Sequence, residues 1–513
     1  MTEYQHAMST LLGFRDAPLT CGLAIGDRQI PLGVTAYVGG GFIYLHAPVV
    51  AAWFHGWTSD PYFFRYVGIL AYLIDGWLIY LLSLRFWGRR TAWWAAALWL
   101  TTPNLFFIAI ADLQWELEPA LFAMLSVLML LSSFEKKRVA QFLAGCFVLG
   151  FVSTTRLDAF LLLVLCSAVY LALVRPPSIL GPTKEFLRGR WWIVPSGIIA
   201  VAIGALPLIV YNVICPWGRL SSFINKTVIP YTFDVPVPLT TRLLIRIDQF
   251  FDVNALHKMP FLEVHQPNYV HAAAFIGAVT VLTLSIRRWW ITFPLLALIL
   301  IIPLSLLSTG VLRHEHMIPL QVLTTLLVAS GLSADHERIM SVFRTRRMMW
   351  LRQGILVAVL CANVVVQAVG WTAWQSQPRD RDTILNQSAP VQLERYLRRF
   401  GSGDRVFFTN IGLYIYQQYL TADRFDAEEI IVWEGEDQFR KTVERILREP
   451  GSRRVFIGSS VERDGTRFSM PRTGILLEVL DRHSVPHSRE TLSTPRRTNL
   501  YEVVIVEAGH RIP

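Results

Sequence analysis

Three carboxylates stand between two long apolar runs, a place where charged side chains are costly. Asp112, Glu116 and Glu118 occur in ADLQWELEP, between TAWWAAALWLTTPNLFFIAI and ALFAMLSVLMLLSS. Acids beside a bilayer usually have a partner or a task. Glu118 precedes Pro119, which suits the first turn of a helix, where the helix dipole favours a carboxylate. Two interpretations of Glu118 stay open: a helix cap, or a carboxylate that works on an acceptor together with Asp112.

Basic side chains gather in VLRHEHMIPL, between two later apolar runs. Arg313, His314 and His316 lie within four residues. Histidines two residues apart cannot share a helix face, so the spacing does not indicate a helical zinc site. An arginine at the headgroup level suits a phosphate through its bidentate fork, and the alternative is ordinary snorkelling to the interface.

Two further stretches carry candidates for binding an anion. TTRLDAF places Arg156 two residues before Asp158, so the two side chains either bind each other or leave Arg156 for a phosphate. The polar segment 214–266 contains Arg219, and loops of this length are more often functional than idle. No Cys or His spacing in the chain predicts a metal site.

The elements that position these residues are membrane-spanning helices. Of 513 residues, 53% are hydrophobic and 17% are charged, against about 25% charge in average soluble domains. Apolar stretches of about 20 residues can cross a bilayer as helices. The buried core of a soluble protein cannot accommodate so many long apolar stretches, so the sequence indicates a membrane protein. The ten predicted spans are 66–86, 93–110, 119–134, 141–155, 159–174, 192–213, 269–286, 291–307, 317–332 and 353–372, and 34–55 is an eleventh candidate.

The charges of the connecting loops predict which side each loop faces. The net charge is +10, which in a membrane protein reports cytoplasmic loops more often than nucleic-acid binding. One alternating set of loops (85–90, 135–138, 175–190, 287–288 and 335–352) holds 17 Lys and Arg, and the opposite set (111–118, 154–158, 214–266 and 308–316) holds 7. The first set is predicted to be cytoplasmic. The acidic loop and everything after residue 372 then face outward.

The chain changes character at about residue 376. Strand patterns at 405–410, 429–433, 453–460 and 500–508 alternate with amphipathic helical patterns at 437–449 and 473–483. This alternation predicts a small α/β domain over 376–513, with a largely parallel sheet. The fold class is therefore mainly α: a polytopic bundle of 10 to 11 spans over 1–375, followed by this domain.

The bundle resembles the membrane-embedded GT-C glycosyltransferases of the protein O-mannosyltransferase and aminoarabinose-transferase type. The similar stretches, in family order, are IPLGVTAYVGGGFIYLHAPVVAAWFHGWTSDPYFFRYVGIL, LSLRFWGRRTAWWAAALWLTTPNLFFIA, ELEPALFAML, STTRLDAFLLL, PLIVYNVICPWGRL and LRHEHMIPLQVL. The family carries an acidic pair after its first helix, whereas this chain opens with MTEYQHAMSTLLG. We therefore expect residues 1–64 to be the first external and juxtamembrane segment, with the first helix missing.

The resemblance implies an inverting transfer of a sugar from a polyprenyl-phosphate donor to a lipid, glycan or protein acceptor. It implies no nucleic acid and leaves a divalent metal open, although no spacing indicates one. Its implied setting is a bacterial inner membrane, with the C-terminal domain outside. The residues it implies are Glu3 or Asp27 as base, Asp112 and Glu118 as acceptor or base partners, and Arg156, Arg219, Arg313, His314, His316 and Tyr37 for substrate binding.

The alternative is a non-enzymatic membrane protein, either a lipid or solute transporter or a degenerate scaffold of the same fold. A transporter typically carries polar residues in mid-span and internal repeats. Few charges interrupt these spans, Asp75 being one, and no repeat is visible. The sequence therefore favours the enzyme.

Overall fold

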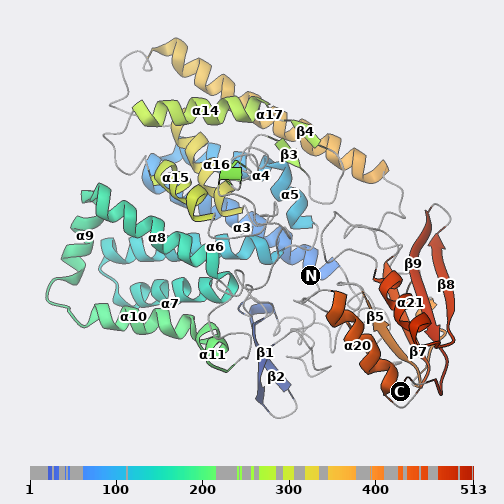
Figure 1. Cartoon of the computed structure of the whole chain (residues 1–513). Coiled ribbons are helices and arrows are strands. Elements are labelled where there is room, and N and C mark those ends of the chain that lie inside the picture. The colour runs from blue at the N-terminus through green and yellow to red at the C-terminus, as the bar shows by residue number, and fades with distance from the viewer. Residues whose placement is uncertain are drawn as a thin grey trace.

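The chain forms a bundle of helices and a separate small α/β domain (Figure 1). The computed structural model describes residues 21–25, 28–33, 41, 44–46, 62–110, 114–214, 240–241, 243–244, 256–258, 265–267, 269–284, 293–305, 318–333, 345–376, 393, 396–401, 403–409, 426–430, 436–449, 452–459, 472–494, 497–510 and 512. The bundle helices are α3 (Tyr62–Trp87), α4 (Arg89–Thr101), α5 (Pro103–Ile110), α6 (Gln114–Lys136), α7 (Val139–Thr155), α8 (Leu157–Val174), α9 (Pro177–Leu187), α10 (Ile193–Gly204), α11 (Leu206–Ile214), α14 (Tyr269–Leu284), α15 (Phe293–Ser305), α16 (Ile318–Ser333) and α17 (Arg346–Ser376).

These helices confirm the prediction of a polytopic transmembrane bundle. Within the described residues, α3, α6 and α17 are each long and apolar enough to cross a membrane. Two bent pairs, α8 with α9 and α10 with α11, pass the same criteria together, and α7, α14 and α16 contain shorter apolar helices. Each of the ten predicted spans coincides with one helix or with two consecutive helices. The eleventh candidate, 34–55, lies mostly outside the described residues.

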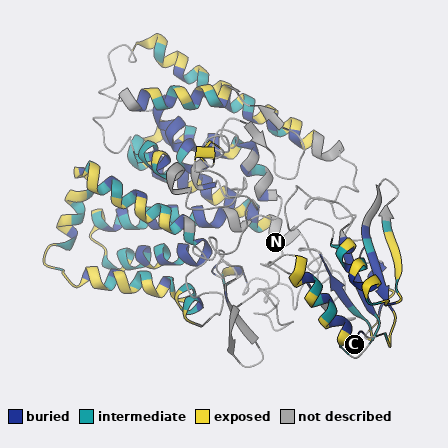
Figure 2. Ribbon diagram, viewed as in Figure 1, coloured by how far each residue is buried: buried dark blue, intermediate teal, exposed yellow. Residues whose placement is uncertain are grey.

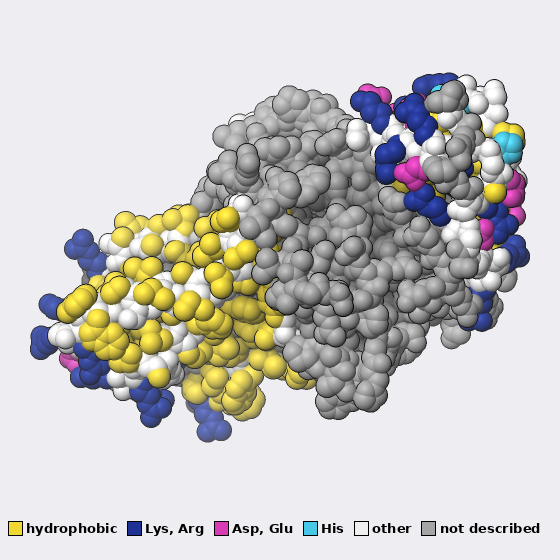
Figure 3. Space-filling view, turned by 90° about the horizontal axis from the view of Figure 1, so that it is seen from below, with side chains coloured by type: hydrophobic (Ala, Val, Ile, Leu, Met, Phe, Trp, Pro, Cys, Tyr) yellow, Lys and Arg dark blue, Asp and Glu magenta, His cyan; other side chains and the backbone are white. Residues whose placement is uncertain are grey.

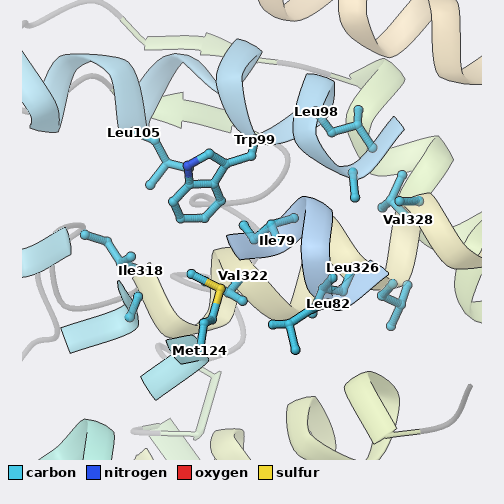
Figure 4. Packing of buried hydrophobic residues seen from close by; sticks show 14 of the residues in the cluster. Ile79, Leu82, Leu98, Trp99, Leu105, Met124, Ile318, Val322, Leu326 and Val328 are labelled. Carbon is cyan, nitrogen blue, oxygen red and sulfur yellow. The ribbon is translucent and has the colours of Figure 1, made fainter. Parts of the chain in front are cut away.

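The core of the bundle is built from small and branched apolar side chains that α3 brings against α4, α6 and α16 (Figure 4). Trp99 is fully buried at its centre. Its indole N–H donates to the backbone oxygen of Tyr72 at 3.1 Å, and the Tyr72 hydroxyl donates to the backbone oxygen of Trp99 at 3.2 Å. A buried indole or phenol needs such a partner, so this reciprocal pair fixes α3 against α4.

The outer faces of the helices are apolar, as a lipid-facing surface requires. Large hydrophobic side chains are exposed along α3, α8, α10, α11 and α17, while dark-blue buried positions line the inner faces (Figure 2). Figure 3 shows one such apolar face, with Lys and Arg side chains gathered at one end of it. In water this surface would be an aggregation hazard, whereas in a bilayer it is the surface expected of a spanning bundle.

The two ends of the bundle differ in chemistry. At one end, here called the basic end, Arg85 pairs with Glu135 at 2.6 Å. At the same end Arg352 of α17 donates to the last backbone oxygens of α16, those of Gly331 and Leu332. The first contact joins the ends of α3 and α6, and the second joins the start of α17 to the end of α16. The opposite end, here called the Glu118 end, contains the starts of α6, α14 and α16.

Two short hairpins are also described. The strands β1 (Cys21–Ile25) and β2 (Arg28–Gly33) pair antiparallel, and Leu32 packs against Tyr211 of α11. The strands β3 (Leu256–Lys258) and β4 (His265–Pro267) pair antiparallel at the end of the predicted external loop 214–266.

The C-terminal domain is an α/β domain, as predicted, but its sheet is mixed. The strands β5 (Arg405–Phe408), β6 (Asp426–Glu429), β7 (Arg454–Ser459), β8 (Ser488–Thr494) and β9 (Arg497–Val506) lie in the order β6-β5-β7-β9-β8. β5 is parallel to β6 and β7, whereas β9 is antiparallel to β7 and β8. The prediction of a largely parallel sheet was wrong here because β8, a polar edge strand that lacks an apolar pattern, was missed and pairs with β9 as a hairpin.

Both faces of this sheet are covered. The helices α20 (Glu436–Arg448) and α21 (Thr473–Arg482) bury Phe439, Val443 and Leu476 against one face. Leu393, Tyr396, Leu397 and Phe400 cover the other face. This explains why the central strands read as apolar runs rather than as alternating patterns.

Candidate functional site

Glu118 is paired with a histidine at the Glu118 end of the bundle. Its Oε1 atom lies 2.8 Å from Nε2 of His46, a residue 72 positions earlier in the chain. Glu118 is 4% exposed and His46 is also buried. The second oxygen, Oε2, is buried and has no hydrogen-bond partner among the described residues. One oxygen is thus oriented by the imidazole, and the other is left for a further hydrogen bond.

The helix-cap interpretation of Glu118 does not fit this geometry. The sequence predicts that α6 begins at Pro119, but the helix begins at Gln114. Pro119 therefore lies inside the helix, and Glu118 is past the first turn, where the free backbone N–H groups are. The side chain binds His46 instead of the helix start. The remaining interpretation is a carboxylate with a role outside helix capping.

The segment that carries His46 also touches the end of α7. A Cβ atom on Gly41 would collide with Oγ1 of Thr154 and crowd the Phe151 ring. Only glycine allows this close approach. Residues 41 and 44–46 therefore lie between the start of α6 and the junction of α7 with α8.

Arg156 lies at that junction. The sequence predicts a loop over 154–158, but α7 runs to Thr155 and α8 begins at Leu157, so Arg156 is the single residue between two helices. Its side chain is buried, in an extended backbone conformation. The hydroxyl of Thr155 donates to Val152 O, within the last turn of α7. A buried guanidinium is thereby held at the Glu118 end, two residues beyond the contact of Thr154 with Gly41.

Asp75 is a second buried carboxylate near Glu118. It lies in the middle of α3 with 0% exposure, and neither carboxylate oxygen has a hydrogen-bond partner among the described residues. It lies close enough to Glu118 for the two carboxylates to interact electrostatically. α3 and α6 run parallel, as the contact of Arg85 with Glu135 near their last turns shows, so Asp75 lies deeper in the bundle than Glu118. An unpaired acid at such a site is costly and usually functional.

Polar groups also begin α14 and α16 at this end. His271 and Gln321 are both buried within their first turn. Neither amide atom of Gln321 has a hydrogen-bond partner in the described part of the chain. The Glu118 end therefore combines a carboxylate, two imidazoles, a guanidinium and an amide in an otherwise apolar bundle, and the carboxylate of Asp75 lies deeper in the same bundle.

The structure brings together two of the residues expected from the sequence, Glu118 and Arg156, at one end of the bundle. The other candidates, Glu3, Asp27, Tyr37, Asp112, Arg219, Arg313, His314 and His316, lie outside the described residues. The side chains of Glu116 and Asp158 are also outside what is described. For these positions the expectations stay predictions.

Sequence reasoning missed His46 and gave Asp75 no role. The signal for Asp75 was present, because an acid inside a predicted span is rare. His46 had no comparable signal, because a lone histidine in an apolar segment is uninformative until its partner is known. In the described part of the chain, no group of three or more His, Cys, Asp or Glu side chains could hold a metal ion.

No protein-family model matches the sequence, and no curated protein matches it significantly. Among solved structures, apo ArnT from Cupriavidus metallidurans matches with a TM-score of 0.56 and 12% identity, over 100% of this chain and 94% of that chain. ArnT bound to undecaprenyl phosphate matches with a TM-score of 0.58 and 12% identity, over 100% and 95%. At this identity the likeness concerns the fold, and it confirms the fold expected from the resemblance. The chain has the whole-chain fold of ArnT, a membrane aminoarabinose transferase of the GT-C class.

Proposed function

We propose that the chain is a membrane glycosyltransferase that moves a sugar from a polyprenyl-phosphate donor to a lipid, glycan or protein acceptor. The observation that carries the proposal is the match over the whole chain to ArnT, one structure of which holds undecaprenyl phosphate. A buried carboxylate–histidine pair at one end of the bundle supports it, because such groups suit proton transfer.

The proposed reaction is a single displacement. The acceptor hydroxyl loses its proton to a carboxylate and its oxygen bonds to the anomeric carbon of the sugar. The bond from that carbon to the phosphate oxygen breaks, and the electron pair leaves with the phosphate. Attack opposite the leaving group inverts the anomeric carbon. The step needs a base beside the acceptor and positive charge beside the phosphate.

Glu118 is the candidate base whose surroundings the structure describes. His46 orients one of its oxygens, and the other has no hydrogen-bond partner among the described residues. That second oxygen suits the acceptor proton. Glu3, Asp27 and Asp112 stay proposed as further acids of the same site.

Arginine is proposed to hold the donor phosphate. Arg156 is buried at the Glu118 end, and a guanidinium can bind two phosphate oxygens at once without a metal. We assign Arg313, Arg219, His314, His316 and Tyr37 to the same task on sequence grounds. The phosphate of the lipid donor is negatively charged. Cationic side chains or hydrogen-bond donors beside it would stabilise it as the leaving group.

The reaction is proposed to occur on the extracytoplasmic face of a bacterial inner membrane. The loops with 17 Lys and Arg against 7 in the opposite set support this orientation, and the basic end of the bundle would then be cytoplasmic. The C-terminal domain follows α17, which begins at the basic end, and would lie outside with the Glu118 end. There it would bind the acceptor or stabilise the bundle.

The test is transfer of a labelled sugar from polyprenyl phosphate in proteoliposomes. Purified protein is mixed with a panel of polyprenyl-phosphate sugars and a membrane extract that supplies acceptors. The expected result is label in a lipid, glycan or protein product, lost in Glu118→Gln. A protein that only moves lipid or solute, or a degenerate scaffold, would leave the label on the donor with every sugar, and that result would overturn the proposal.

A further inference from the structure

Helix α9 leaves the direction of α8 abruptly and lies across the basic end of the bundle. The angle between the two helices is 101°. Arg175 ends α8 in a left-handed conformation, with φ of 49°, and Pro176 and Pro177 follow. Because α8 is an apolar helix of the bundle, a helix at this angle to it lies near the plane of the membrane surface rather than across the bilayer.

Packing holds α9 in this position. Phe186 is fully buried, and its ring centroid lies 5.6 Å from that of Phe134 and 5.4 Å from that of Phe142. Lys137, in the turn between α6 and α7, pairs with Glu185 at 3.0 Å. The helix is thus attached to α6 and α7 by its apolar side, and its opposite side faces outward.

Basic side chains in α9 and just beyond its two ends give this part of the chain an excess of positive charge. Arg175, Lys184 and Arg188 are exposed, and the Arg190 guanidinium lies 6.0 Å from the Phe186 ring. Between residues 175 and 192 the sequence has one acid, Glu185, and Lys137 pairs with it. We call Arg175, Lys184, Arg188 and Arg190 the α9 platform. Its charge is not neutralised within α9.

An apolar surface adjoins the platform directly. Trp191 is 82% exposed, and Trp192, Leu180 and, in α10, Val194 and Ile198 are also exposed. Figure 3 shows Lys and Arg gathered at the end of such an apolar face. Indole rings beside cationic side chains are typical of the level where lipid headgroups meet acyl chains. Free phosphate or an acidic protein would match the cations but leave Trp191 without a partner.

We propose that the α9 platform binds the headgroup of an anionic phospholipid, whose acyl chains lie along Trp191 and the exposed face of α10. Cations bind the headgroup phosphate, and a lipid supplies the apolar cover that this surface lacks in water. The site is separate from the Glu118 end, so it does not depend on the proposed reaction.

Native mass spectrometry of the full chain in detergent tests the site with phosphatidylglycerol as the probe and phosphatidylcholine as the reference. We expect phosphatidylglycerol to bind more tightly and to raise the melting temperature of the parent chain. The double variant Lys184→Gln, Arg188→Gln should bind it about thirtyfold more weakly. The matched control is Arg346→Gln, Arg347→Gln, which removes two exposed charges from the start of α17. It should bind like the parent.

Three outcomes would overturn the proposal. Equal binding of the two lipids by the parent chain would remove any preference for negative charge. Equal weakening in the two double variants would show a general charge effect. Complete displacement of the lipid by millimolar inorganic phosphate would mean an anion site without a lipid role. The melting temperatures of the parent chain decide the first point even if the α9 variant does not fold.

Discussion

The imidazole of His46 and the carboxylate of Glu118 lie 2.8 Å apart, buried at the end of a bundle of apolar helices. Removing either partner would leave a buried polar group without compensation, which costs stability. The pair therefore has to be tested by substitutions that keep size and hydrogen bonding while they change charge.

Glu118→Gln should lower sugar transfer at least tenfold, because general-base roles are typically worth about 10²–10⁴-fold. The amide keeps the size of the side chain but cannot accept the acceptor proton. The measurement is specific activity per folded molecule in proteoliposomes, beside a melting curve in detergent. Glu135→Gln is the matched control, since it makes the same change on the same helix at the basic end. If both variants turn over like the parent, Glu118 has no part in the chemistry.

Asp75→Leu should raise thermal stability and lower transfer. Burying a protonated carboxyl group with no hydrogen-bond partner among the described residues costs about 1–3 kcal/mol, and leucine of similar size removes that cost. A residue kept at such a cost usually has a functional role. Melting in detergent and the transfer assay measure the two effects separately. A destabilised variant with normal activity would contradict both expectations and make Asp75 a structural residue.

Gly41→Ala should lower the stability of the folded chain by about 1–3 kcal/mol. The new methyl group would collide with Oγ1 of Thr154 and crowd Phe151, so the His46 segment would have to move. Gly354→Ala on α17 is the control, because its Cβ would meet open space and alanine suits a helix interior better. Thr154→Ala added to Gly41→Ala should restore part of the loss. A neutral Gly41→Ala would mean that the segment does not pack against α7.

The C-terminal domain should lose stability in acid through Asp404. Burial raises the pKa of this carboxyl, but hydrogen bonds from Arg453 and the Gly401 N–H outweigh it and hold the pKa below its usual value. A lowered folded-state pKa contributes stability above the unfolded pKa, about 3.9, which is lost as pH falls through the folded pKa. The Arg453 fork makes two contacts of 2.9 Å with Asp404.

Asp404→Asn should therefore cost about 1 kcal/mol at pH 7, discounted for partial exposure. The difference from the parent should shrink below about pH 4. Hydrogen exchange of β5 and β7 in the full chain, compared at each pH with the parent, measures it. Asp481→Asn, exposed on α21, is the control. A loss of equal size at pH 7 and in acid would show that the charge of Asp404 is not involved.

Fusions after Pro513 should report an extracytoplasmic C-terminal domain. Alkaline phosphatase folds and works outside the cytoplasm, and a green fluorescent reporter exported unfolded stays dark. We expect an active phosphatase and a dark fluorophore, because the loop charges favour this orientation. Bright cytoplasmic fluorescence would show that the proposed orientation is wrong and that the C-terminal domain lies in the cytoplasm.

Hydropathy alone determined the helices of the bundle. A span such as 66–86 is a local property of the chain, because a helix in lipid satisfies its own backbone hydrogen bonds without help from distant residues. For the same reason the ten predicted spans coincide with helices. The apolar runs 405–410 and 453–460 contain β5 and β7, because central strands that are covered on both faces are apolar throughout. The resemblance, which rests on motifs spread along the chain, predicted how these helices are arranged in the fold.

Only the tertiary structure decided which residues meet. His46 and Glu118 are 72 residues apart, and Gly41 meets Thr154 across more than one hundred. No pattern in either segment encodes the other, because their contact is set by how α6 and α7 pack. The same is true of the position of α9: Pro176 and Pro177 mark the end of α8 in the sequence, but only the packing of Phe186 against Phe134 and Phe142 shows where α9 lies. The membrane-spanning helices follow from the hydropathy of consecutive residues. The candidate site depends instead on side chains that packing brings together from distant parts of the chain.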